Sequence, residues 1–341
     1  MVDRALPSVG AMSIEPEEEQ EDEAPSKPPN QANVVLAIDI TAERFEAALV
    51  TPTGSLVDRA SVLVERDVGP ESHYTNLAGI VTEMLTVADE RHGVNIVGVG
   101  VGSAGPVGRH LEKVSPAGIV SWRDFPLRAR LVELTGLAVH GDFDAKVLAL
   151  AEGWLGAAQG HQNFCTITVS GSVAGGLVLD GDLLDGASGY AGQVGHIIVE
   201  PGGRRCVCGA QGCLDAEASG AAIESITGRP LTEPTYEIMQ RTGRLVGRAA
   251  ATVCNTLDLT LVVVGGTIAR NFAATFFHSA QAALEEHAQL PYSRGARITP
   301  SRLGDNGQLI GAGAFGWRQI RRAQRSASSS DRPTGQPPNA R

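Results

Sequence analysis

Apolar runs of strand length alternate with helical stretches along this chain of 341 residues, in two successive series. The first series has strand patterns at 33–40, 44–60 (a pair), 94–108 and 137–144, with helical spacing at 77–93 and 126–136. The second has a helix, a hairpin, a long helix, a buried strand and two further helices, at 144–160, 163–184, 236–257, 259–269, 271–288 and 309–320. Strands that open each half and helices that cover them predict an α/β fold in two lobes.

The charge is unevenly distributed along the chain, whose formal net charge is −10. Residues 1–33 are acidic and rich in Pro and Gln, and residues 323–341 are polar and basic, so we expect both ends to be disordered. The body between them is acidic and has no basic stripe, which argues against nucleic acid as its main partner. No apolar run reaches membrane-spanning length and no secretory signal is visible, so we expect a cytoplasmic protein.

Three of the five cysteines lie within eight residues, at Cys206, Cys208 and Cys213, and His196 precedes them. Thiolate and imidazole ligands suit Zn²⁺, and three Cys with one His is a common set in closed structural sites. A reducing compartment favours a metal over a disulfide here. Unligated buried thiols are the simpler alternative, and redox chemistry is disfavoured because no C-x-x-C is present. We therefore expect a structural zinc site that leaves no position for activating water.

The segment around this cluster, GASGYAGQVGHIIVEPGGRRCVCGAQGCLDAEASG, resembles the ROK family of repressors, open reading frames and kinases. The resemblance continues in VGVGSAGPVG, SPAGIVSWRDFPL, GDFDAKVLALAEGWLGAAQG, GGLVLDGDLLDG and VVVGGTIA, and covers about residues 34–320. It implies an actin-like (ribonuclease-H-like), two-lobed sugar-kinase fold with a small structural zinc module. The implied lobes are 34–140, completed by a C-terminal helix at about 308–322, and 141–307, which holds the zinc module at 196–213. ATP and a hexose would bind between the lobes, and the protein would form a homodimer or homotetramer.

The resemblance also implies the site residues. Asp144 matches the family's catalytic base, which accepts the proton of the attacking sugar hydroxyl. An Asp at the start of a helix would serve equally well as its N-cap, so both roles stay open. The implied sugar-binding residues are Ala104, Gly105, Phe143, Gln193, His196 and Asp215. The implied nucleotide-binding residues are Asp39, Thr41, Ala42, Glu43, Gly171, Ser172, Gly265 and Gly266.

The nucleotide positions depart from the family's pattern. Where the family has Asp-Ile-Gly-Gly-Thr-Lys, this sequence has DITAER, so Thr41 and Ala42 replace two glycines and Glu43 replaces a threonine. Side chains there block the close approach of backbone to phosphate. A Glu43 carboxylate about 4 Å from a phosphate oxygen would add repulsion on the order of 4 kcal/mol. The second loop, Gly-Thr-Gly-Ile-Gly in the family, is SGSVA at 170–174, where only Gly171 is a glycine.

The sugar positions depart from the pattern as well. Phe143 and Ala117 stand where the family has asparagine, and Gln193 and Asp215 stand where it has glutamate. Gln193 and Asp215 can still bond hydroxyl groups, whereas Ala117 and Phe143 cannot, although Phe143 can stack on a sugar face. We do not expect a standard glucose pocket.

Three functions follow as expectations. The first is a sensor or binding protein that closes on a sugar-like ligand with weak or no phosphotransfer, because the scaffold motifs persist while the phosphate-binding motifs are altered. The alternative is an ATP-dependent hexose or amino-sugar kinase that uses Mg²⁺-ATP and Asp144 as base. The second alternative is a ROK-type transcriptional regulator without its DNA-binding domain, since residues 1–33 are too acidic and aperiodic for a helix-turn-helix.

Overall fold

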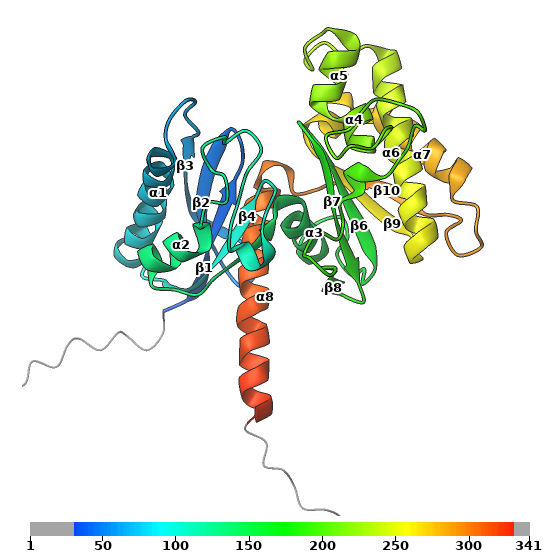
Figure 1. Cartoon of the computed structure of the whole chain (residues 1–341). Helices are drawn as coiled ribbons and strands as arrows, with labels where there is room; N and C mark the ends of the chain where they lie inside the picture. Colours follow the sequence, from blue (N-terminus) through cyan, green and yellow to red (C-terminus); the bar gives the residue numbers. More distant parts are fainter. Residues whose placement is uncertain (1–30, 331–341) are drawn as a thin grey trace, which may run out of the picture. The chain divides into compact units, whose positions relative to one another are not determined.

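The computed structural model describes residues 31–330 (Figure 1). Its strands are β1 (Asn33–Ile40), β2 (Arg44–Val50), β3 (Leu56–Leu63), β4 (Asn95–Ser103), β5 (Val139–Phe143), β6 (Phe164–Val169), β7 (Val173–Leu179), β8 (Asp182–Leu183), β9 (Leu261–Gly265) and β10 (Arg297–Pro300). Its α-helices are α1 (Pro70–Glu90), α2 (Leu127–Thr135), α3 (Asp144–Trp154), α4 (Leu214–Ala218), α5 (Gly220–Thr227), α6 (Tyr236–Leu257), α7 (Thr267–His287) and α8 (Gly307–Ser330). Short 3₁₀ helices are η1 (Arg109–Leu111), η2 (Val194–His196) and η3 (Gly304–Asn306). The expectations for residues 1–30 and 331–341 lie outside the described residues.

The first sheet has the strand order β3-β2-β1-β4-β5. Strands β1, β4 and β5 run parallel, and β2 runs antiparallel to both β1 and β3. The register pairs Asp39 with Gly102 and Gly102 with Asp142, so the carboxyl ends of the three parallel strands meet at one edge. In α/β sheets this is the edge at which ligands ordinarily bind.

The residues of β1 alternate between the two faces of this sheet, as the period of a strand requires. Every second residue from Leu36 to Ile40 joins the core that α1 covers. Ala37 faces the opposite side, where it packs with Leu309 of α8. The same alternation places Asp39 on the α8-facing side, at the carboxyl end of the strand.

Glycines in β4 and α8 let this helix lie against the sheet at backbone contact distance. A Cβ atom added at Gly100 would lie 1.9 Å from the carbonyl oxygen of Ala312, and one added at Gly316 would lie 3.3 Å from the nitrogen of Gly100. A Cβ added at Gly102 would lie 2.8 Å from a methyl group of Val147 in α3. The run VGVGVGS therefore turns Val99 and Val101 toward α1 and its glycines toward α8 and α3.

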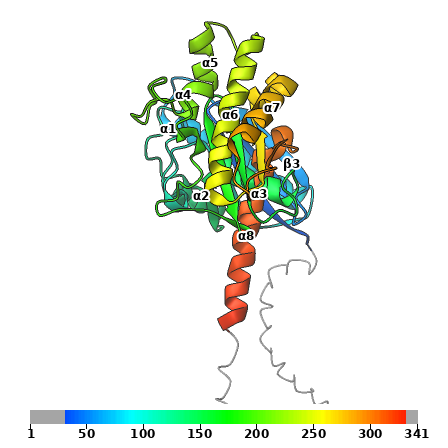
Figure 2. The same ribbon diagram turned by 90° about the vertical axis from the view of Figure 1, so that its right-hand side faces the viewer.

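The second sheet has the order β10-β9-β6-β7-β8, in which β6, β9 and β10 run parallel and β7 runs antiparallel to β6. The antiparallel pair is the hairpin that the sequence predicted at 163–184. Helices α6 and α7 pack side by side over this sheet (Figure 2). Their buried residues form one core with β6 and β9.

Helix α3 connects the two sheets. It follows β5 directly and packs against α8, β6 and β7. A Cβ added at Gly176 of β7 would lie 2.8 Å from the carbonyl oxygen of Ala145, so the first turn of α3 lies directly on the second sheet. Asp144, at the junction of β5 and α3, therefore lies where the two sheets approach each other.

The structure confirms an α/β fold and adds elements that the sequence did not indicate. Helices α4 and α5 and strand β10 were not anticipated, because each is short and has little periodicity. Helix α8 continues to Ser330, into the stretch 323–341 that the sequence predicted as disordered. Residues 323–330 contain no Gly or Pro that would end the helix. None of the described helices combines the length and apolar character needed to cross a membrane.

The contact between β4 and α8 predicts a large effect for a single methyl group. In Gly100→Ala the new Cβ would overlap the Ala312 carbonyl, so strand and helix must separate. We expect the free energy of unfolding, measured by urea denaturation, to fall by about 1–3 kcal/mol. The matched control is Gly79→Ala in α1, which has open space around it and improves helix propensity. Equal stability of the two variants would contradict the close contact.

Candidate functional site

The carboxyl edge of the first sheet holds a buried carboxylate, Asp39, at the end of β1. Its side chain is 3% exposed, and its Oδ1 atom has no hydrogen-bond partner among the described residues. Burial raises the pKa of Asp39 well above its usual value, and the negative charges of Asp144 and Glu46 raise it further. A buried carboxylate oxygen without a partner is costly unless a cation or a donor group of a ligand meets it.

Asp144 is the first residue of α3 and lies beside Asp39. The Cβ position of Gly102 is 3.6 Å from the Asp39 Oδ1 atom and 3.9 Å from the Asp144 Cα atom, so this glycine separates the two acids. The backbone N–H of Ala145 donates to Asp144 Oδ1 at 2.6 Å. Burial raises the pKa of Asp144 to about 6. The helix has no side-chain cap, so the N-cap role considered for Asp144 finds no support in this geometry.

Three of the predicted sugar-binding residues gather at the same edge. Ala104 follows β4, and its N–H donates to the carbonyl of Ile40 at 2.8 Å. A Cβ added at Gly105 would lie 2.3 Å from the ring of Phe143, so the ring covers the loop that leaves β4. Phe143 immediately precedes Asp144, and an apolar surface therefore borders the carboxylate pair.

The turn between β1 and β2 is closed by its own side chain. The N–H groups of Glu43 and Arg44 donate to Thr41 Oγ1 at 3.3 and 3.1 Å. A Cβ added at Gly118 would lie 2.5 Å from the Cβ of Ala42, so the 115–124 loop lies against this turn. The turn therefore follows the carboxyl end of β1. The amides of Glu43 and Arg44 are already occupied, however, and the methyl group of Ala42 stands where the resemblance implied a glycine.

The remaining sugar-binding candidates lie at the start of β7. Asp215, in α4, accepts a hydrogen bond from the N–H of Val173 through Oδ1 at 2.7 Å. The Cβ position of Gly195 is 3.4 Å from the Asp215 Cβ, which brings the segment of Gln193 and His196 to the same place. The described contacts join these residues to the second sheet, not directly to Asp144.

The remaining nucleotide candidates lie at the ends of β6 and β9. Ser172 closes the turn after β6, because its carbonyl accepts from the N–H of Ser170 at 3.0 Å. Ser170 Oγ in turn accepts from the N–H of Thr267, the first residue of α7, at 3.1 Å. Gly171, in the same turn, has open space on its side-chain side.

Gly265 is the last residue of β9 and pairs with Thr168 of β6. Gly266 follows it with φ 98° and lies against Val169. Both the backbone conformation and the packing therefore require a glycine at 266.

Four side chains of the Cys/His segment converge on one point. The ligand atoms of His196, Cys206, Cys208 and Cys213 all lie within 4.8 Å of one another. The His196 Nδ1 to Cys206 Sγ distance and the Cys208 Sγ to Cys213 Sγ distance are both 3.6 Å. Gly212 makes the fold of this loop possible, because a Cβ there would lie 1.7 Å from the Glu200 carbonyl oxygen. These four residues could hold a metal ion.

Two charged residues that the sequence reasoning missed are almost fully buried. Glu217 of α4 accepts from the N–H of Arg204 at 2.5 Å and forms an ion pair with Arg241, so it ties the Cys/His segment to α6. Lys146 of α3 forms ion pairs with two aspartates. Neither is an isolated charge in its helix, because Asp215 precedes Glu217 in LDAEA and Asp144 precedes Lys146 in DAKVLALA, so the local sequence contains no signal that could have identified them.

Comparison with known proteins finds a family model and several relatives that agree with one another. A sequence model of the ROK family matches residues 35–318. A glucokinase from Halalkalibacterium halodurans is 28% identical over 309 residues, which cover 82% of this chain and 93% of that protein. An N-acetylmannosamine kinase from Yersinia pseudotuberculosis is 30% identical over 249 residues, which cover 68% of this chain and 82% of that protein. The crystal structure of a ROK hexokinase from Thermus thermophilus matches with a TM-score of 0.75 at 29% identity, over 85% of this chain and 99% of that chain.

These similarities confirm the actin-like, two-lobed sugar-kinase fold that the resemblance implied. All three proteins are sugar kinases by name. They therefore favour the kinase alternative over the sensor without phosphotransfer that we expected first.

The raised pKa of Asp144 predicts a pH-dependent stability. Burial disfavours the ionised carboxyl in the folded state, so its ionisation lowers the stability of the fold to the full extent above about pH 6. Below the usual pKa of an aspartate the carboxyl is protonated in both the folded and the unfolded state, and it then has no effect on stability. In Asp144→Asn we expect the free energy of unfolding to rise by about 2–3 kcal/mol at pH 8, with a gain that shrinks between pH 6 and pH 4. Urea denaturation across this range measures it. Asp89→Asn, an exposed change in α1, should have no such profile; a flat difference for Asp144→Asn would show that the carboxyl is solvated.

Proposed function

The chain belongs to the ROK family, and from this premise we propose that it is an ATP-dependent kinase of a hexose or an amino sugar. The observation that carries the proposal is the carboxylate pair: a desolvated Asp144 beside a buried Asp39 whose Oδ1 atom has no partner among the described residues. The kinase relatives support the same reading.

In this proposal Asp144 is the general base. A pKa of about 6 leaves the carboxyl ionised at neutral pH and still basic enough to accept a proton from a sugar hydroxyl. As that proton moves to Asp144, the hydroxyl oxygen bonds to the γ-phosphorus and the bond to the ADP oxygen breaks. The N–H of Ala145 fixes one carboxylate oxygen, which leaves the other for the substrate. Phe143 would border the sugar and exclude water from it.

Asp39 fits a divalent cation. An orphaned carboxylate oxygen next to a second acid is the donor set that Mg²⁺ prefers, and a cation there would offset the repulsion between the two acids. When bound with ATP, Mg²⁺ would neutralise charge on the phosphate oxygens. Asp39 would hold the cation near Asp144, and it would not itself accept the proton of the sugar hydroxyl.

This kinase activity predicts Mg²⁺-dependent ADP release with at least one hexose or amino sugar. Because Asp144→Asn removes the base and leaves the hydrogen bond from Ala145, we expect its kcat to fall at least about 100-fold while the sugar Kd changes little. A coupled ADP assay over a panel of hexoses and amino sugars measures turnover. Asp89→Asn is the control that should keep full activity. Undiminished turnover in Asp144→Asn would sink the assignment of the base.

A sugar-binding protein without phosphotransfer is the second candidate, and the closed turn at Thr41 favours it. The amides of Glu43 and Arg44 donate to Thr41 Oγ1 and are not free for phosphate oxygens. The Glu43 carboxylate and the Ala42 methyl group would also oppose a triphosphate at this turn. In that case the same sugar panel would raise the melting temperature with no ADP release by the wild-type protein.

We further propose that the metal held by His196, Cys206, Cys208 and Cys213 is a structural Zn²⁺. Three sulfurs and one imidazole nitrogen match its preferred donors, and four protein ligands leave no open position. Burial and the neighbouring sulfurs raise the pKa of Cys213, so a cation is needed to hold the three sulfurs as thiolates together. The homodimer or homotetramer expected by resemblance also stays a proposal, as does the regulator reading.

The zinc proposal predicts one Zn²⁺ per chain by elemental analysis. Cys213→Ser should lose most of it and lower the melting temperature, because the loop between η2 and α4 loses its cross-link. Cys254→Ala, a buried cysteine of α6 outside the cluster, should keep the metal. Full zinc content in Cys213→Ser, or none in the wild type, would contradict the site.

A further inference from the structure

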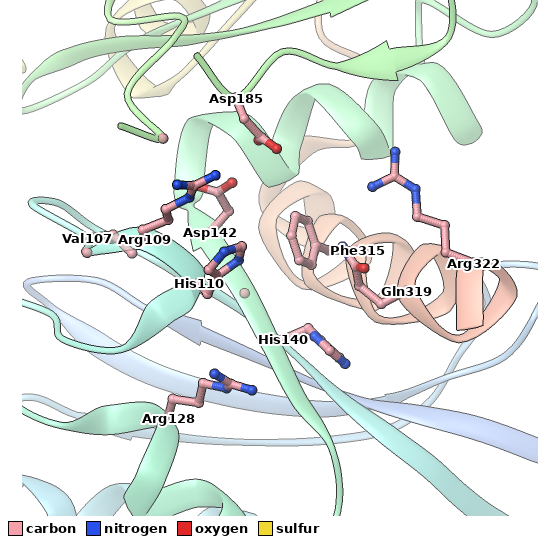
Figure 3. A pocket seen from close by; sticks show the side chains of 13 residues that line it. Val107, Arg109, His110, Arg128, His140, Asp142, Asp185, Phe315, Gln319 and Arg322 are labelled. Carbon is pink, nitrogen blue, oxygen red and sulfur yellow. The ribbon is translucent and has the colours of Figure 1, made fainter. Parts of the chain in front are cut away.

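A second cavity lies outside the carboxylate site. Its volume is about 410 Å³, and β5, the η1 segment, α2, the loop after β8 and α8 contribute to its wall (Figure 3). Neither Asp39 nor Asp144 lines it. The size is that of a pocket for a small organic molecule.

Five basic side chains gather in this cavity, and neither of its arginines Arg109 and Arg128 has an acidic partner among the described residues. The five are Arg109, His110, Arg128, His140 and Arg322. Within residues 31–330, the Arg109 guanidinium makes no hydrogen bond and no ion pair. Arg128 donates from Nε to the carbonyl of Val139 at 3.2 Å, and no described carboxylate lies within ion-pair distance of it. Two guanidinium groups are thus available to a ligand.

The two acids of the cavity share one lysine. The Lys146 Nζ atom lies 2.6 Å from Asp142 Oδ2 and 3.0 Å from Asp185 Oδ1, and it also donates to the carbonyl of Gly189. The Lys146 side chain is only 2% exposed, so its charge offsets one of the two carboxylate charges and does not serve a ligand. Arg322 in turn pairs with Asp182 at 2.9 Å. Set against the one carboxylate charge that remains, Arg109 and Arg128 leave the cavity positive.

The histidines experience this excess of positive charge. Burial lowers the pKa of His140, and the charges of Arg128 and His110 lower it further. Figure 3 shows His110 and His140 beside β5, with Phe315, Gln319 and Arg322 on the helix opposite. In a chain of net charge −10, a cavity with an excess of positive charge is suited to an anion.

We propose that this cavity binds a phosphate-bearing small molecule, a phosphomonoester with a short polar carbon chain. A planar guanidinium group matches two phosphate oxygens by paired hydrogen bonds, which a singly charged anion would use less fully, and Arg109 and Arg128 each offer one such group to the cavity. The Gln319 amide can bond a hydroxyl group of the same molecule. The remaining volume, bordered by Phe315, leaves room for the carbon atoms of a short chain.

The cavity is lined by segments that also contribute residues to the carboxylate site. Strand β5 carries His140 and Asp142 into the cavity and ends next to Asp144. The loop that contributes Val107 begins with Gly105, which lies against Phe143. A ligand there would brace both segments, yet its binding requires neither ATP nor phosphotransfer. The inference therefore stands apart from the proposed kinase activity.

Isothermal titration calorimetry with glycerol 3-phosphate, inorganic phosphate and glycerol tests the proposal. We expect the two phosphates to bind the wild-type chain and glycerol not to bind. Arg109→Gln and Arg128→Gln should each weaken glycerol 3-phosphate at least about tenfold, because each removes a charged hydrogen-bond donor. Arg229→Gln, an exposed arginine beyond α5, is the matched control and should bind like the wild type.

Three outcomes would overturn the proposal. They are no binding of either phosphate to the wild-type chain, equal binding by both cavity variants and the control, and equal binding of glycerol and its phosphate. Equal binding by all variants would place the phosphate elsewhere, for example near Asp39. If Arg128→Gln fails to fold, the binding measured for Arg109→Gln still tests the proposal, because the exposed side chain of Arg109 makes no contact that the fold needs.

Discussion

The backbone contact between β4 and α8 is the constraint on which the rest of this structure depends. The carbonyl of Ala312 occupies the place where a side chain of Gly100 would stand, so helix and strand approach to a distance that no other residue permits. Because α8 lies so close, α3 can pack on it and reach Gly102. Asp144 at the start of α3 is thereby held beside Asp39. The position of the two acids follows from glycines that touch no ligand.

The electrostatics of the site follow from this packing. An acid that closes a row of apolar residues on β1 is desolvated, which raises its pKa, and the negative charge of Asp144 beside it raises the pKa of Asp39 further. Burial raises the pKa of Asp144. Such a pair suits a site that binds a cation on one side and removes a proton on the other. The turn at Thr41 departs from the glycine pattern that the resemblance implied, and its Glu43 and Arg44 amides are satisfied from within the turn.

Much of the fold could be predicted from the sequence, because its strands and long helices have clear periodicity. The VGVGVGS run indicated a strand, but only the structure shows why every second residue is glycine. The Cys/His spacing predicted a convergent cluster, which the structure brings together. In contrast, the cavity beside β5 was not foreseen. Arg109 and Arg128 come from separate segments, and nothing in their local sequence indicates that Lys146 pairs with the acids of the same cavity.

The place of α8 in the chain has a consequence for how the protein is made. The first sheet is complete once β5 has been synthesised, yet one of its faces is covered by residues that leave the ribosome only after the whole second sheet. Until then Val35, Ala37 and Asp39 of β1 have no α8 against them, and this face of the sheet is open to wrong partners. A half-covered sheet is therefore exposed while the second sheet is made, and a ribosome-associated chaperone would have reason to engage it before α8 emerges.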